Sequence, residues 1–208
     1  ELEVQHLKSM ITHRTKLVAL AHVSNVLGTI NPVHRVITLA HEQGIPVLLD
    51  GAQAVPHLEV DVRELNCDFY AFSAHKLYGP MGVGVLYGKE KYLEEMPPYQ
   101  GGGEMVDQVT FQKTTYNKLP YKFEAGTPNV SGVLGFEAAI KYILDLDLKK
   151  IHAYERELLD YMTLELLKMD SVKIFGNAEN KTAVISYNIG NIHPYDAGTI
   201  YDKLGIAV

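Results

Sequence analysis

The chain alternates short, continuous apolar runs with longer segments in which apolar residues recur every three or four positions. Continuous runs of this length are typical of strands buried in a parallel sheet. Four of them are predicted as strands: Lys16–His22, Pro46–Asp50, Asp68–Ser73 and Val83–Tyr87. After the first run, Asn31-Pro32 opens a predicted helix with one apolar face, which Gly44 ends. Because helices or crossovers separate the strands, we expect an α/β fold with a mainly parallel sheet flanked by helices.

The second half of the chain predicts an irregular region followed by two long helices. Residues 97–120 are rich in glycine, proline and polar residues and are long for a passive connection, which favours a functional loop or a hairpin extension. Helices are predicted over Val130–Leu144 and Lys149–Met169, and the second carries an apolar stripe that we expect in the core. The stripe consists of Ile151, Tyr154, Leu158, Met162, Leu166 and Met169.

A domain boundary is predicted near residues 145–147. Residues 1–146 are expected to form part of a large domain, and residues 147–208 an incomplete smaller α+β domain. Its predicted elements are strands over Val172–Phe175 and Ala183–Asn188 and a helix over Tyr195–Leu204. The last residues, 205–208, have the pattern of the beginning of a buried strand, so we expect the chain to be incomplete.

Composition excludes several classes of function. With 208 residues, 47% of them hydrophobic, a net charge of −6 and no cluster of Lys and Arg, the chain is predicted to be globular and not to bind nucleic acid. Its apolar runs are too short to predict a membrane span. The single cysteine, Cys67, is expected to be a buried small hydrophobe and suits a reducing, cytoplasmic location.

The nine histidines do not indicate a metal site. His34 and His41 share a helix face but are seven residues apart, too far to chelate one ion, and are expected to be solvated. The sequence holds no His-Glu-x-x-His or Cys-x-x-Cys pattern, so no metal is predicted. His22 ends a predicted strand near the candidate site, where either a packing role or a supporting role in the site is open.

Polar residues that could carry chemistry follow the predicted strands. Asp50 ends one strand, and Ser73-Ala74-His75-Lys76 follows the next, at the carboxyl edge where open α/β sheets build their sites. A lysine can form a Schiff base with an aldehyde, and a carboxylate can pair with a protonated pyridine nitrogen. Hydroxyl and imidazole groups can hold a phosphate. Each residue alone has a simpler explanation as a turn, cap or solvated loop, but together they indicate pyridoxal 5'-phosphate (PLP) chemistry.

Longer motifs carry a resemblance to a known family. Residues 47–54 (VLLDGAQA) and 68–80 (DFYAFSAHKLYGP) closely resemble the class V aminotransferase superfamily of fold-type I PLP enzymes. Within it, the sequence is similar to the cysteine desulfurase and selenocysteine lyase group. Residues 21–28 (AHVSNVLG), 101–105 (GGGEM) and 123–129 (FEAGTPN) resemble its SUF-type, or group II, branch.

The resemblance implies a role for each matching residue. Lys76 would carry PLP and later move the substrate α-proton. Asp50 would pair with the pyridinium nitrogen, and Gln53 would hydrogen-bond the ring hydroxyl. Ser73 and His75 would bind the phosphate. Two further residues lie outside this pair of motifs: Thr127 would reach the phosphate of the partner subunit in a homodimer, and Asn25 would hold the substrate carboxylate.

The implied activity is that of a PLP-dependent cysteine desulfurase, which converts L-cysteine to L-alanine and passes the sulfur, as a persulfide, to an acceptor protein for iron–sulfur cluster assembly. By the same resemblance, the persulfide cysteine would follow Val208, so the chain alone is expected to be inactive. Two alternatives stay open. One is a selenocysteine lyase or another related PLP enzyme acting on L-selenocysteine, and the other is a truncated, non-catalytic dimerisation or binding protein.

Overall fold

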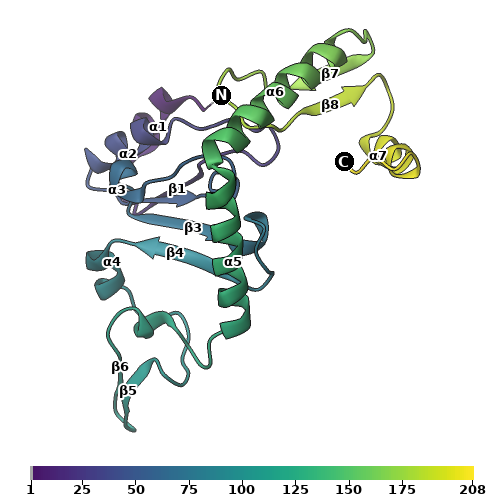
Figure 1. The fold of residues 1–208 in the computed structure, drawn as a ribbon. Helices are drawn as coiled ribbons and strands as arrows, with labels where there is room; N and C mark the ends of the chain where they lie inside the picture. Colours follow the sequence, from purple (N-terminus) through teal and green to yellow (C-terminus); the bar gives the residue numbers. More distant parts are fainter. Residues whose placement is uncertain (1) are drawn as a thin grey trace.

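The computed structural model describes residues 2–208, and its largest layer is a four-stranded sheet (Figure 1). The sheet order is β1-β2-β3-β4. Strands β1 to β3 are parallel, and β4 is antiparallel to β3, which confirms the predicted mainly parallel sheet. The strand bounds are Val18–Ala21 for β1, Val47–Asp50 for β2, Phe69–Ser73 for β3 and Gly84–Gly88 for β4.

The direction of β4 follows from the length of its connection. Only residues 74–83 separate β3 from β4, and a parallel crossover needs about a dozen residues or more. The chain instead turns back through the 3₁₀ helix η1 (Ala74–Lys76) and a glycine turn, so that Ser73 pairs with Gly84. The beginning of β4 therefore lies beside the end of β3.

Helices cover both faces of this sheet. On one face, α2 (Val33–His41) and α3 (Val62–Leu65) pack on the sheet through a buried cluster that includes Val47 and Leu49. On the other face, α5 (Val130–Leu146) packs against the segment that follows β3. Phe136 of α5 forms one buried cluster with Ala74 and Leu77 of that segment. The short helix α1 (Val4–Met10) lies beside α2. The fold therefore has the layers that the sequence predicted.

The irregular region of residues 97–120 contains a β-hairpin. It follows α4 (Glu90–Glu95) and consists of β5 (Val106–Val109) and β6 (Thr114–Tyr116), which pair antiparallel. The 3₁₀ helix η2 (Tyr121–Phe123) then leads toward α5. The hairpin projects away from the main sheet (Figure 1), which confirms the predicted hairpin extension.

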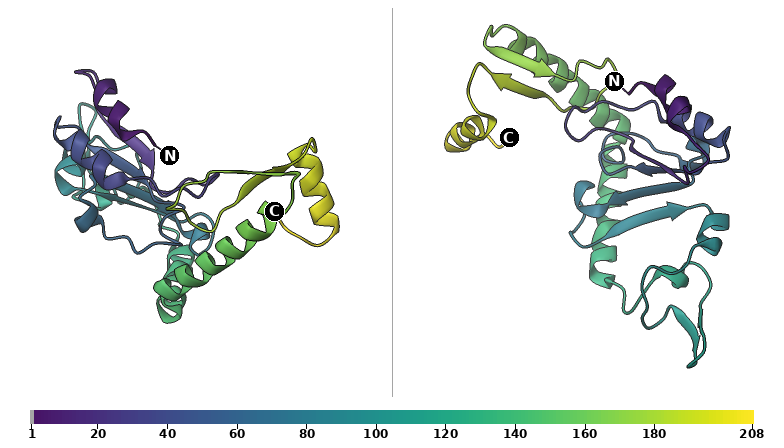
Figure 2. Two further views of the ribbon diagram at one scale, coloured as in Figure 1. Left: turned by 90° about the horizontal axis from the view of Figure 1, so that it is seen from above. Right: turned by 180° about the vertical axis from the view of Figure 1, so that it is seen from behind.

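The residues after Asp147 form a part of their own, which we call the C-terminal segment (148–208). It contains α6 (Leu148–Leu167), the antiparallel pair β7 (Val172–Phe175) and β8 (Ser186–Ile189), and α7 (Pro194–Lys203). Figure 2 shows that β7, β8 and α7 lie to one side of the main sheet. Asp147 separates α5 from α6 and has a positive φ of 69°. The division of the chain into two domains at this point stays a prediction.

Two expectations for the C-terminal segment are wrong. The stripe on α6 is mostly exposed rather than core: Tyr154, Leu158, Met162 and Met169 are all exposed, and Leu166 is buried. The periodicity shows that this face is apolar, but no element among residues 2–208 covers most of it. Residues 206–208 form no strand and are exposed, because no neighbouring strand in the described chain pairs with them.

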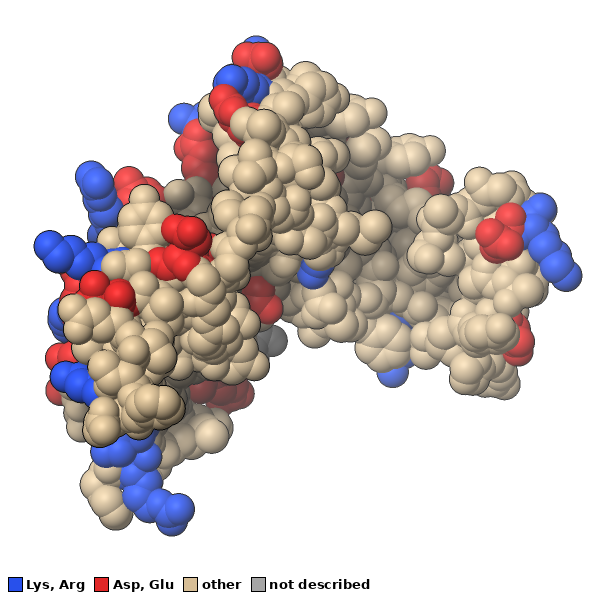
Figure 3. Space-filling view, turned by 90° about the horizontal axis from the view of Figure 1, so that it is seen from below, with Lys and Arg blue, Asp and Glu red and all other residues tan. Residues whose placement is uncertain are grey.

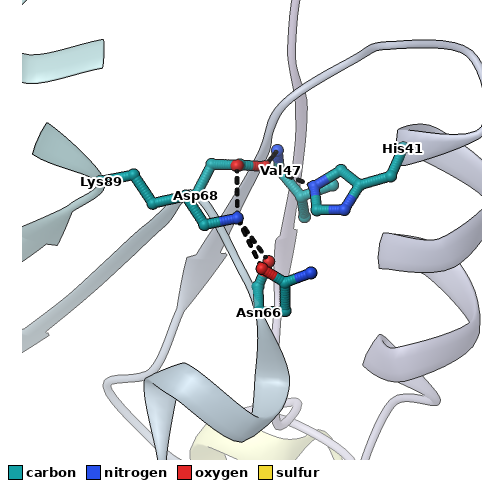
Figure 4. A network of polar contacts seen from close by, with 5 residues as sticks. All are labelled: His41, Val47, Asn66, Asp68 and Lys89. Carbon is teal, nitrogen blue, oxygen red and sulfur yellow. Dashed lines mark hydrogen bonds and ion pairs between the residues drawn. The ribbon is translucent and has the colours of Figure 1, made fainter. Parts of the chain in front are cut away.

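A buried polar network lies at the amino ends of the parallel strands (Figure 4). Asp68 has a side chain only 1% exposed and accepts hydrogen bonds from His41 Nε2 at 2.7 Å, Lys89 Nζ at 2.9 Å and Val47 N at 2.8 Å. The expectation that His41 is solvated is therefore wrong, because the end of α2 places its ring against this carboxylate. Cys67 is fully buried, as predicted.

The surface does not resemble that of a compact monomer. The accessible area is 14348 Å², whereas a compact chain of 23.2 kDa would expose about 9,700 Å². Figure 3 shows a broad hollow between the main body and the C-terminal segment, with Lys and Arg side chains interspersed with Asp and Glu on that face. Within residues 2–208, every helix is too short or too polar to span a bilayer. The 208 residues therefore expose far more surface than a compact monomer of this mass.

Candidate functional site

The predicted site residues gather at the carboxyl edge of the sheet, on loops that follow three neighbouring parallel strands. Asn25 follows β1, Asp50 ends β2, and Lys76 follows β3. Backbone hydrogen bonds join neighbouring strands as far as this edge. His22 N donates to Asp50 O at 2.8 Å, and Gly51 N donates to Ala71 O at 2.8 Å. Neighbouring strands in a sheet are about 4.8 Å apart, so the three loops begin side by side.

Asp50 presents its carboxylate to solvent. Its register partners are Ala21 on β1 and Ala71 on β3. One oxygen, Oδ1, accepts a hydrogen bond from Ala52 N at 2.9 Å, which forms the tight turn expected of an aspartate at a strand end. The side chain is exposed, and the hydrogen bonds within residues 2–208 leave its other oxygen available. The residue can therefore form a turn and still receive a cationic ligand atom.

A buried tyrosine lies directly under this turn. A Cβ atom on Gly51 would come within 2.0 Å of Cε1 of Tyr70, so only glycine fits there. Tyr70 is 1% exposed, and its hydroxyl forms a 3.0 Å hydrogen bond with His22 Nδ1. The sequence analysis missed Tyr70. The available signal was a tyrosine in an apolar strand, because a buried tyrosine hydroxyl usually requires a partner.

Burial fixes the charge state of this pair. Desolvation lowers the pKa of His22 to about 4, with a smaller contribution from the nearby charge of His34. Desolvation also raises the pKa of Tyr70. Both side chains are therefore neutral near pH 7 and are linked by a neutral hydrogen bond. His22 contacts Tyr70 beneath the turn, which is consistent with a supporting role in the site.

The segment after β3 buries Ala74 and Leu77 and exposes the two residues between them. Ala74 and Leu77 are buried against α5, and Ala74 N donates to Val83 O at 3.0 Å. His75 and Lys76 lie between these anchors and are exposed. The hydroxyl-bearing Ser73, at the end of β3, is half-buried. The fold thus presents a hydroxyl, an imidazole and an amine within four consecutive positions.

Gln53 and Asn25 lie on loops at the same edge of the sheet. Thr127 lies on a different segment, and no hydrogen bond within residues 2–208 connects it to this edge. Gln53 is half-buried in the turn that follows Asp50, and Asn25 is exposed in the loop after β1. Thr127 is exposed on the segment between η2 and α5. The individual roles of all these residues stay predictions.

The donor set fits PLP. An amine, a carboxylate, an amide, a hydroxyl and an imidazole stand on two neighbouring strand ends, which matches an aldehyde, a pyridine nitrogen, a ring hydroxyl and a phosphate. In contrast, no group of three or more His, Cys, Asp or Glu residues among the described residues could hold a metal ion. The donor set at this edge suits an organic cofactor of this kind, and the assignment of Lys76 as its carrier stays a prediction.

Comparison with known proteins agrees with this chemistry. The aminotransferase class-V family model matches residues 1–208. A cysteine desulfurase of Shigella sonnei (strain Ss046) is 49% identical over 208 residues, which cover 100% of this chain and 51% of that protein. A probable cysteine desulfurase of Xylella fastidiosa (strain 9a5c) is 45% identical over 207 residues, covering 100% of this chain and 50% of that protein.

Solved structures show the same fold. The cysteine desulfurase CsdA (S-sulfonic acid) from Escherichia coli superposes with a TM-score of 0.92 at 40% identity, covering 99% of this chain and 51% of that one. The apo cysteine desulfurase from Thermococcus onnurineus NA1 superposes with a TM-score of 0.93 at 35% identity, covering 100% and 52%. The chain spans about half the length of the relatives that it matches.

The chain belongs to the aminotransferase class-V family. Its relatives are cysteine desulfurases, and its fold is that of fold-type I PLP enzymes, which confirms the predicted fold class. The cofactor that this family membership implies is PLP, in agreement with the donor set at the sheet edge.

Proposed function

We propose that the protein is a PLP-dependent cysteine desulfurase of the SUF type. The observation that carries this proposal is the placement of Asp50 and Lys76 on neighbouring strand ends in a chain 49% identical to a cysteine desulfurase. The proposed reaction takes L-cysteine and an enzyme thiol and gives L-alanine and an enzyme persulfide. One sulfur atom moves from the substrate to the thiol, and the C–S bond of the substrate is replaced by a C–H bond, so that no external oxidant or reductant is needed.

Each residue of the edge has a proposed task. Lys76 would hold the cofactor through its amine, and the same amine would take the α-proton of the substrate and return a proton to it. Asp50 would pair its carboxylate with the pyridine nitrogen, and its negative charge would favour the protonated form of that nitrogen. When bound, PLP supplies an electron sink for the negative charge that develops at the substrate Cα. Ser73 and His75 hold the phosphate, and Gln53 donates to the ring hydroxyl.

Asn25 is proposed to bind the substrate carboxylate. Its side-chain amide supplies two N–H donors, and the loop that carries it is exposed beyond the end of β1. A neutral donor at this place fixes the orientation of the substrate without changing the charge balance around Asp50.

The thiol that accepts sulfur is not Cys67. This is the one cysteine of the sequence, and it is fully buried beside the Asp68 network, at the opposite edge of the sheet. Burial raises the pKa of its thiol, so it is not a nucleophilic thiolate near neutral pH. We therefore propose that the acceptor cysteine belongs to protein outside these 208 residues.

The proposal includes a homodimer in a reducing cytoplasm and a sulfur-acceptor protein that serves iron–sulfur cluster assembly. The large accessible surface supports association, and exposed apolar side chains occur before the hairpin, on it and at the start of α5. They include Tyr99, Phe111, Val130, Val133 and Leu134. Thr127 lies between these two regions in the sequence. If they meet a second subunit, Thr127 is carried to the interface and can reach the phosphate bound by the partner.

The test uses the protein expressed from its complete gene, reduced with borohydride and mapped by mass spectrometry. We expect a pyridoxyl group on Lys76 and equal amounts of alanine and transferred sulfur from L-cysteine. Lys76→Ala should lower the rate of alanine formation by about 10³-fold or more, because it removes both the cofactor anchor and the base. Normal turnover by this variant would overturn the proposed mechanism.

The same protein separates the alternatives. A selenocysteine lyase would turn over L-selenocysteine and leave L-cysteine nearly untouched, whereas a desulfurase releases sulfur from L-cysteine at a substantial rate. A non-catalytic binding protein would show no pyridoxyl group on Lys76 and no turnover of either amino acid.

A further inference from the structure

The loop after β1 is held by the C-terminal segment. We call residues 24–30 the Asn25 loop and residues 176–186 the clamp. An isolated antiparallel β-bridge joins Thr29 of the loop to Lys181 of the clamp. Thr29 is 5% exposed, although Asn25, four residues earlier, is exposed to solvent. The loop thus has one buried arm and one exposed turn.

Hydrogen bonds hold both ends of the exposed turn. Gly28 O accepts from Thr182 N at 2.9 Å and from Thr182 Oγ1 at 3.3 Å, and Thr182 is 2% exposed. The hydroxyl of Ser186 donates to Val26 O. On the other side, Ser24 Oγ accepts from Val26 N at 3.3 Å. The peptide group after Asn25 is therefore held within its own loop, and the next peptide group, after Val26, is held by the clamp.

The backbones of the loop and the clamp also approach each other too closely for side chains. A Cβ atom on Gly28 would lie 2.9 Å from Thr182 O and 3.0 Å from Val184 Cβ. A Cβ atom on Gly176 of the clamp would lie 2.9 Å from Leu27 Cβ. Both glycines have a positive φ, 69° for Gly28 and 77° for Gly176. Such contacts leave no room for the loop to shift while the clamp stays in place.

The C-terminal segment that carries the clamp also contacts the main body through α6. His57 Nδ1 lies 2.9 Å from Glu155 Oε2, which joins the turn after Gln53 to α6. Both side chains are about one-fifth exposed, at 22% and 21%. The C-terminal segment therefore contacts the main body both beside the proposed cofactor turn and at the Asn25 loop.

We propose that the clamp positions Asn25 for the substrate, so that residues far away in the sequence set the affinity for the substrate carboxylate. Ser186, Gly28 and Gly176 act as positioning residues, because they hold the loop and touch neither cofactor nor substrate. This inference rests on the proposed function of Asn25. It adds that substrate affinity depends on where the C-terminal segment lies against the main body.

The test compares Gly28→Ala and Ser186→Ala with a matched control, Gly44→Ala, in the protein expressed from its complete gene. Gly44 has nearly the same φ as Gly28, 67°, but a Cβ atom there would meet nothing within 4 Å. The control therefore carries the backbone strain without the collision. We call Gly28→Ala and Ser186→Ala the clamp variants, because each disturbs a contact between the Asn25 loop and the clamp. For both we expect KM for L-cysteine to rise about tenfold with kcat little changed, and PLP content and absorption to stay normal. The control should keep its KM.

A double-mutant cycle shows whether the effect passes through Asn25. Once Asn25→Ala has removed the amide, Ser186→Ala should add little further loss, and Ser186→Thr, which keeps a hydroxyl, should retain most of the affinity. A normal KM in both clamp variants, or fully additive effects with Asn25→Ala, would overturn the inference while leaving the desulfurase proposal intact. Absence of cysteine turnover by the unmodified protein would instead overturn the proposed function and this inference with it.

Discussion

The two aspartates at opposite ends of the parallel strands, Asp68 and Asp50, differ in burial and in hydrogen bonding. At the amino edge, Asp68 is buried and its carboxylate is saturated by His41, Lys89 and a backbone N–H (Figure 4). At the carboxyl edge, Asp50 is exposed and accepts a hydrogen bond from Ala52 N in its own turn. Burial and satisfied hydrogen bonds mark a structural aspartate, whereas exposure at the end of a parallel strand marks one that is available to a ligand.

The electrostatics of Asp68 agree with a structural role. Burial alone would raise the pKa of this carboxyl, but the hydrogen bonds from His41, Lys89 and Val47 outweigh it, so its pKa is lowered. The folded protein therefore holds Asp68 ionised. Its contribution to stability is present above the ordinary aspartate pKa near 3.8 and is lost as the pH falls through the lowered value.

The largest expected effect is on activity, at the carboxyl edge. Asp50→Asn removes the charge proposed to pair with the cofactor but keeps the size and the turn-forming side chain. We expect kcat for alanine formation to fall about 10³-fold, with a thermal unfolding midpoint close to that of the unmodified protein. Steady-state kinetics and calorimetry on the same sample measure both quantities. A comparable loss of stability at Asp50 would remove the contrast between the two edges.

The matching change at the amino edge should act on stability instead. Asp68→Asn removes the only anionic partner of Lys89 among the described residues, although Asn66 still accepts from its ammonium. The loss of this half-buried ion pair is expected to cost about 3 kcal/mol of unfolding free energy. Urea denaturation gives this value from the shift of the midpoint at constant slope. The kcat of the folded variant should stay near normal. A selective fall in kcat would show that the amino edge contributes to the reaction.

A smaller effect is expected on the pH dependence of stability, through His22, which is buried beneath the site. The pKa of His22 is about 4 in the folded protein against an ordinary value of 6.5, so between these values the unfolded chain binds the additional proton. Stability therefore falls as the pH falls through this window, by roughly 2 kcal/mol between pH 7 and pH 5. Urea titrations at the two pH values measure this difference.

The control for this prediction is His22→Gln, which can still hydrogen-bond Tyr70 but does not titrate. In this variant the difference in stability between pH 7 and pH 5 should shrink by most of the predicted amount. An unchanged difference would mean that another group titrates in this window. Asp68 does not interfere, because its lowered pKa places its effect below this range.

Local patterns in the sequence were sufficient to predict the sheet, its flanking helices and the strand ends that carry Asp50 and Lys76. Apolar runs fix where strands lie, and a polar residue at the end of a run is visible without knowing its neighbours. The pairing of Tyr70 with His22 was not predictable in this way, because it depends on the register of strands 48 residues apart. Likewise, periodicity showed that α6 has an apolar face but not what covers it.

The contact between Gly28 and Thr182 joins residues 154 positions apart, which has a consequence for synthesis on the ribosome. Translation of that interval takes roughly 8–30 s at ordinary speeds of about 5–20 residues per second. During this time strands β1 to β4 can already pair in the nascent chain. The carbonyl of Gly28, however, cannot yet accept its hydrogen bonds from Thr182. The loop proposed to recognise the substrate is therefore completed late, when the last part of the clamp has left the exit tunnel.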